Sequence, residues 1–189
     1  MDAGRVHWHD EVRESVADLI ETFGVNSYPV DIFGIASRMG IKLVPYSSLD
    51  LELRESIISY FPDGFLRRSE GYINVREVTI FYNDINRSLE RMRFTVAHEL
   101  GHLYMNSDDE AVANFFAGYL LAPEPLVLRY SDLDKFAIAA DFNVSVSCAE
   151  IIMEKAMSRI YSKRPLSNYE SVILDNCLFC SRDKGVKIA

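Results

Sequence analysis

The chain contains 189 residues, of which 49% are hydrophobic and 25% are charged. This length and composition indicate one globular domain and exclude a disordered, collagen-like or coiled-coil chain. Lys and Arg number 20 against 28 Asp and Glu, which gives a net charge of −8, so we expect no direct binding to nucleic acid.

The first half of the chain predicts two helices followed by a small sheet. Apolar residues recur at helical spacing over 10–23, and a second helical stripe ends at Met39, with Pro29 at an expected first helical position. Strands are predicted where β-branched and aromatic residues cluster, at 41–44, 65–67, 72–75 and 78–82. The last three are expected to form an antiparallel sheet, since turn residues separate them.

The second half of the chain predicts a series of helices, at 88–106, 107–121, 132–141 and 147–161. Two of them begin with Ser followed three residues later by Glu, at Ser107 and Ser147, which is the spacing of a capping box. We therefore predict an α+β fold that is mainly helical, with a small antiparallel sheet. Its single domain spans 1–165, and a tail of uncertain structure follows over 166–189.

The segment that carries chemistry is His98-Glu99-Leu100-Gly101-His102. On a helix, His98 and His102 project from the same side one turn apart, so both imidazoles can bind one zinc ion. Glu99 points about 100° away from His98, beside the metal, where a general base for an activated water belongs. The alternative is a buried helix with two hydrogen-bonded core histidines. A metal is favoured because it satisfies three polar groups that an apolar helix would otherwise bury.

A third ligand is expected from the next helix, because a tight turn makes the two helices antiparallel neighbours. Glu110 begins a face of small, mostly apolar residues, where a carboxylate needs a cation or strong donors. Asp108 and Asp109 are rivals, but acids in a first turn also serve as capping partners. Asn114, one turn beyond Glu110, is interpreted either as a hydrogen-bond partner of the site or as a helix-packing amide.

These two helices resemble the zinc-site helices of the ImmA/IrrE metallopeptidase family. The resemblance is carried by the run from Arg91 to Leu103 and by Glu110-x-x-Ala113-Asn114-x-Phe116-Ala117-x-x-Leu120-Leu121-x-Pro123. It implies a gluzincin-like helix pair, with His98, His102 and Glu110 as zinc ligands and Glu99 as the catalytic base. It also implies site-specific cleavage of a helix-turn-helix repressor. The chain departs from the family at Asn106, where His is frequent, and at Ile151-Ile152, where Arg is frequent.

The function predicted on these grounds is a zinc-dependent endopeptidase that cleaves a regulatory protein, a helix-turn-helix repressor encoded nearby. The alternative is a non-proteolytic binding module, or a toxin–antitoxin-type partner, that binds a repressor without cutting it. The intact Glu99 favours the enzyme, because this residue is not needed to hold zinc. Donors for the developing oxyanion stay open among Tyr60, Tyr72 and Tyr82.

Cysteine usage and the N-terminal sequence indicate the cytoplasm and no membrane. Cys148, Cys177 and Cys180 cannot all pair, and sparse, odd cysteine usage is typical of a reducing compartment. The N-terminus carries no signal-like apolar run, and no run of about 18 apolar residues follows. Cys177 and Cys180 have zinc-knuckle spacing, but without a second pair they are interpreted as part of a reduced tail.

Overall fold

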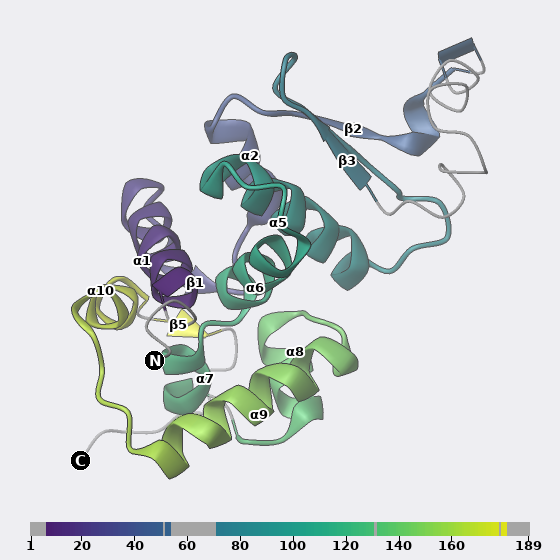
Figure 1. Ribbon diagram of the computed structural model, residues 1–189. Coiled ribbons are helices and arrows are strands. Elements are labelled where there is room, and N and C mark those ends of the chain that lie inside the picture. Colours follow the sequence, from purple (N-terminus) through teal and green to yellow (C-terminus); the bar gives the residue numbers. More distant parts are fainter. Residues whose placement is uncertain (1–6, 51, 54–70, 131, 178, 181–189) are drawn as a thin grey trace.

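The computed structural model describes residues 7–50, 52–53, 71–130, 132–177 and 179–180. The helices are α1 (His7–Thr22), α2 (Ile32–Arg38), α5 (Leu89–Met105), α6 (Glu110–Leu121), α7 (Glu124–Tyr130), α8 (Lys135–Phe142), α9 (Val146–Ser162) and α10 (Asn168–Asn176). The strands are β1 (Ser27–Tyr28), β2 (Lys42–Pro45), β3 (Gly71–Asn74), β4 (Thr79–Tyr82) and β5 (Phe179–Cys180). The fold is α+β and mainly helical, as predicted (Figure 1). The strand predicted at 65–67 lies outside the described residues.

Helix starts are fixed by capping side chains, and three of them differ from the prediction. Asp31, rather than Pro29, precedes α2, because its side chain accepts a hydrogen bond from the Gly34 backbone. Asp109 caps α6 through the Ala111 backbone, and Ser145 caps α9 through the Cys148 backbone. The capping boxes predicted at Ser107 and Ser147 are therefore wrong, since Asp109 lies between Ser107 and α6, and Ser147 lies inside α9, beyond the cap position.

The sheet is mixed, and not wholly antiparallel as predicted. Strands β3 and β4 pair antiparallel, with Gly71 opposite Tyr82, because the short connection between them permits only a hairpin. Strand β2 pairs parallel to β4 on its other side, which gives the order β2–β4–β3. A parallel arrangement is possible there because a long segment separates β2 from β4 in the chain.

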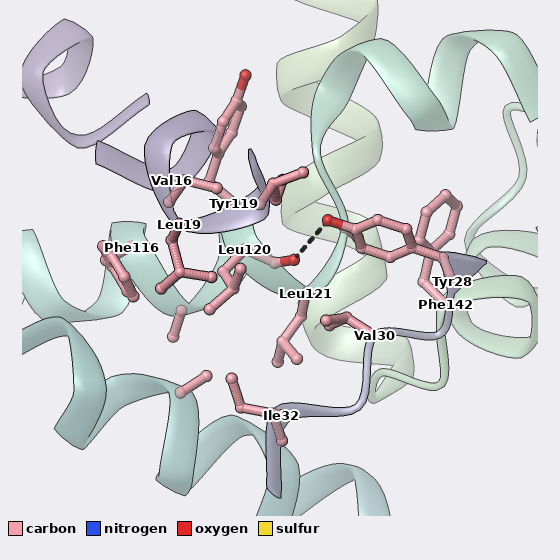
Figure 2. Close-up of a cluster of buried hydrophobic side chains, with 14 of the residues drawn as sticks. Val16, Leu19, Tyr28, Val30, Ile32, Phe116, Tyr119, Leu120, Leu121 and Phe142 are labelled. Atoms are coloured by element: carbon pink, nitrogen blue, oxygen red, sulfur yellow. Dashed lines mark hydrogen bonds between the residues drawn. The ribbon is translucent and has the colours of Figure 1, made fainter. Parts of the chain in front are cut away.

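The hydrophobic core lies where α1, α5 and α6 meet (Figures 1 and 2). Figure 2 shows Leu19 of α1 and Phe116 and Leu120 of α6 within it, together with residues of the β1 segment. The Tyr28 hydroxyl donates a hydrogen bond to the Leu120 carbonyl at 3.1 Å, which satisfies a buried polar group.

Among the described residues one stretch, Glu110–Arg129, is long and apolar enough to span a membrane. However, 72% of its most apolar window is buried in the protein.

A network of buried charges joins the C-terminal helix α10 to the rest of the fold. The fully buried Glu170 pairs with both terminal nitrogens of Arg159, one of them at 2.9 Å, and accepts a hydrogen bond from the Ser167 backbone. Glu124 of α7 lies 3.8 Å from Arg159 and 3.5 Å from Arg13 of α1. The segment after Pro165, whose structure the sequence left open, thus contains a helix anchored by ion pairs.

Gly101 allows α5 and α6 to approach closely. A Cβ atom at this position would lie 3.1 Å from the Ala113 Cα and 3.2 Å from the Phe116 side chain. The contact with Ala113 is a contact with backbone, so it cannot be relieved by a side-chain rotation. The close approach of the α6 backbone therefore explains a glycine in the middle of α5.

Replacing Gly101 by valine is expected to destabilise the protein by about 1–3 kcal/mol, because the added methyl groups overpack the α5–α6 contact. The matched control is Gly118→Ala in α6, where an added Cβ meets no atom within 4 Å. That change is expected to stabilise the helix by up to about 1 kcal/mol. Urea unfolding of both variants measures the difference, and equal stability of the two would contradict this interpretation.

Candidate metal centre

Helix α5 and the turn after it bring the predicted site residues together. Ser88 caps α5 by accepting a hydrogen bond from the Arg91 backbone, and Asn106 ends it in the left-handed conformation, with φ of 45°. Such an ending reverses the chain direction, and α6 returns alongside α5 (Figure 1). The first residue of α6, Glu110, therefore lies beside the C-terminal half of α5.

Three side chains converge at this point. The Nε2 atoms of His98 and His102 lie 3.1 Å apart. Carboxylate oxygens of Glu110 lie 3.3 Å from the His98 Nε2 and 3.4 Å from the His102 Nε2. Within the described residues this is the group whose ligand atoms could share one metal ion, and it includes neither Asp108 nor Asp109. Asp109 instead caps α6.

Hydrogen bonds at the far side of each ring fix the histidine tautomers. The Nδ1 of His102 lies 2.7 Å from the Ser107 carbonyl, and the Nδ1 of His98 lies 3.1 Å from the Asn114 side-chain oxygen. Both acceptors are oxygens, so each Nδ1 carries the proton and donates it. Burial, and then the neighbouring His102 ring, lower the pKa of His98. Its Nε2 therefore presents a lone pair at neutral pH.

This donor set fits a metal ion. Two Nε2 lone pairs face each other beside a carboxylate, and none of the three has a proton to share with the others. Such an arrangement is repulsive unless a cation lies between the groups. Tetrahedral zinc with bonds of roughly 2.0–2.1 Å places its ligand atoms roughly 3.3–3.4 Å apart. The separations of 3.1, 3.3 and 3.4 Å correspond to that geometry.

Glu99 lies beside this group without joining it. Its side chain is buried, with 7% of the residue exposed, and the Ile73 backbone of β3 hydrogen-bonds to it. Burial raises the pKa of Glu99 to about 7, and the charge of Glu110 also raises it. A carboxylate with such a pKa can take up and release a proton near neutral pH, as a general base requires.

The approach of β3 to α5 positions the Ile73 backbone over Glu99. At Gly71 an added Cβ would lie 2.5 Å from the Thr95 methyl group and 3.6 Å from a Glu99 oxygen. Only glycine permits the strand to lie this close to the helix. The sequence contains no signal for this contact, because it depends on how the sheet packs against α5.

Two of the three tyrosines considered as oxyanion donors, Tyr72 and Tyr82, do not line the cavity around the three converging side chains. Tyr60 lies outside the described residues. Tyr72 stacks on Phe81 at 4.7 Å, on the sheet face opposite to Gly71, and Tyr82 packs against Phe33. The described residues around the cavity include Arg91, Thr95 and Asn114, but no tyrosine.

Asn114 is a hydrogen-bond partner of the site, through His98, and not only a helix-packing amide. Replacing it by alanine is expected to weaken metal binding about 10–100-fold, because the His98 ring loses the acceptor that fixes its tautomer. Asn114→Asp keeps an acceptor and serves as the matched control. Competition of each variant with a chromogenic zinc chelator measures affinity, and unchanged affinity of the alanine variant would exclude this role.

Comparison with known proteins agrees with the geometry. Residues 68–152 match the family model Peptidase_M78, described as the IrrE N-terminal-like domain. This segment is similar to the ImmA/IrrE peptidase family. The matched ImmA/IrrE segment contains the whole of α5 and α6, and with them the converging histidines and Glu110. No curated protein matches the chain.

Proposed function

We propose that the protein is a zinc-dependent endopeptidase in which His98, His102 and Glu110 hold the metal. The match of residues 68–152 to a peptidase family model supports hydrolysis of peptide bonds. The observation that carries the proposal is the convergence of two unprotonated Nε2 atoms and a carboxylate next to the buried Glu99. Two imidazoles and one carboxylate are the protein ligands of catalytic zinc sites that retain an open position.

In this reaction Glu99 moves protons. Zinc, when bound, supplies Lewis-acid polarisation of the peptide carbonyl and of water. Glu99 takes a proton from the attacking water as the new carbon–oxygen bond forms. It then gives that proton to the amine nitrogen as the carbon–nitrogen bond breaks. The hydrogen bond from the Ile73 backbone holds the carboxylate in place for both transfers.

The proposed substrate is a regulatory protein, a helix-turn-helix repressor present in the cytoplasm with the enzyme. The family resemblance supports this part of the proposal, together with the acidic charge, which does not favour binding to DNA by the protein itself. A non-proteolytic module that binds a repressor is the competing function.

Two experiments test the proposal. The zinc-loaded full chain is incubated with a peptide library derived from a cell lysate, and new termini are identified by mass spectrometry. We expect cleavage by the wild type and not by Glu99→Gln. New N-termini are then compared in cells that produce the wild type or Glu99→Gln. A cleaved helix-turn-helix protein supports the substrate, and binding of such a protein without cleavage would favour the module.

A further inference from the structure

A second cavity opens beside the metal centre. It has a volume of about 560 Å³, which lies in the range of ligand-binding pockets. We call it the side pocket. Its apolar lining is contributed by α1, α5, α6, the α8–α9 connection and α9: Trp8, Phe94, Phe115, Val144, Ile151 and Ile152.

The side pocket adjoins the cavity around the metal centre. Arg91, Phe94 and Asn114 line both of them. Asn114 also accepts the hydrogen bond from His98. A polypeptide held at the metal centre therefore passes next to the side pocket.

Gly118 keeps the side pocket open. It follows Ala111, Asn114 and Phe115 along one face of α6, and all of them line the pocket. A glycine inside a helix costs about 1 kcal/mol relative to alanine. At Gly101 this cost has a packing reason, but at Gly118 an added Cβ meets no atom within 4 Å. Helix packing does not require glycine here, whereas any larger side chain would project into the pocket.

Two cations, Arg91 and Lys155, and one carboxylate, Glu90, also line the side pocket. The Lys155 ammonium is 4.3 Å from the centre of the Phe115 ring, and the salt bridges found among the described residues do not include it. The charges of this lining, Arg91 and Lys155 against Glu90, leave one net positive charge, which repels a further cation. The pocket therefore accepts apolar side chains and disfavours those of lysine and arginine.

We propose that the side pocket is the specificity pocket of the peptidase and takes a large apolar side chain, such as that of leucine or phenylalanine, next to the bond that is cut. This inference rests on the proposed function. Burial of such a side chain contributes about 1.5–3 kcal/mol, which corresponds to about 10–100-fold in affinity.

The test uses two hydroxamates, which chelate zinc, and the natural fluorescence of the protein. Trp8 is the single tryptophan of the chain and lines the side pocket. Acetohydroxamate has no side chain to place there, whereas 2-benzylsuccinyl hydroxamate has a benzyl group. We expect the zinc-loaded wild type to bind the benzyl compound about 10–100-fold more tightly, with a change in Trp8 fluorescence.

Gly118→Leu fills the pocket, and Ile151→Gln makes its exposed rim polar. Both are expected to lose most of the benzyl preference and to keep their affinity for acetohydroxamate. Ala140→Leu, on the exposed face of α8, is the matched control. If a folded Gly118→Leu variant and Ile151→Gln both retain the full preference, the proposal is overturned.

A second arm separates the side pocket from the metal centre. N-acetylphenylalaninamide and N-acetylargininamide are titrated against the full chain without zinc, and Trp8 fluorescence is recorded. We expect a response to the phenylalanine derivative only, and the same response from His102→Ala. If the chain binds no zinc but keeps this fluorescence response, the proposed function is wrong and the assignment of the side pocket stands. No fluorescence response in a chain that binds zinc and acetohydroxamate would overturn the pocket alone.

Discussion

Peptide cleavage by Glu99→Gln is expected to be about 10²–10⁴-fold slower than by the wild type, with zinc still bound. Glutamine keeps the size of the side chain and an oxygen that can accept the Ile73 hydrogen bond. It loses only the ability to take up a proton from water. Initial cleavage rates on one peptide from the library, measured together with zinc content, check this result.

Glu154→Gln makes the same chemical change on the exposed face of α9 and is the matched control, with an expected rate close to that of the wild type. Two outcomes would contradict the role of Glu99. One is a wild-type rate in Glu99→Gln. The other is loss of zinc in that variant, since it would make Glu99 a ligand rather than a base.

Arg159→Met is expected to lower the free energy of unfolding by about 3–5 kcal/mol at pH 7. The substitution leaves the fully buried carboxylate of Glu170 with only Arg164, 3.7 Å away, as a cationic partner, and it also removes a charge 3.8 Å from Glu124. For comparison, Lys135 and Glu150 form a more exposed pair, and Glu150→Gln is expected to change stability by about 0–1 kcal/mol. Urea unfolding measures both variants.

The effect of Arg159→Met should depend on pH. Burial by itself raises the pKa of Glu170, but hydrogen bonds from Arg159 and Ser167 outweigh it and hold that pKa below its ordinary value. The ion pair therefore stabilises the fold fully above the unfolded-state pKa of about 4.3, and its contribution is lost as the pH falls through the lower folded-state pKa. Without Arg159, burial raises the pKa of Glu170, so the stability difference between wild type and Arg159→Met should shrink as the pH falls from 7 to 3. A difference that is constant from pH 7 to pH 3 would exclude Glu170 as its source.

The parts of the site that lie on α5 could be predicted from sequence, because they depend on helix geometry alone. Residues four apart on a helix share a face, so His98 and His102 had to lie together. Glu110 could be anticipated next to them since a short turn permits only an antiparallel return of α6. Its separation from both rings, 3.3 and 3.4 Å, comes from the structure.

Contacts between distant segments could not be predicted in this way. The hydrogen bond from Ile73 to Glu99 depends on how the sheet packs on α5, and no local pattern encodes it. The Ser107 carbonyl that orients His102 is a backbone group, so residue identity gives no signal for it. Likewise, β2 pairs in parallel with β4, a strand far along the chain, and no local pattern encodes this pairing.

Helices α7 and α10 were not predicted from the sequence, for a different physical reason. Helix α10 is held by the buried pairing of Glu170 with Arg159, and its few apolar positions form no clear stripe. Helix α7 begins directly after Pro123, where the proline signals only an end to α6. The domain boundary at residue 165 remains a prediction.

Zinc-edge X-ray absorption of the zinc-loaded full chain tests the central claim most directly. The expected result is one zinc ion per chain, with nitrogen and oxygen ligands at roughly 2.0–2.1 Å and no sulfur at roughly 2.3 Å. Combined replacement of His98, His102 and Glu110 should abolish this signal. A sulfur shell, or an unchanged spectrum in the combined variant, would contradict the assignment of these three residues as the metal site.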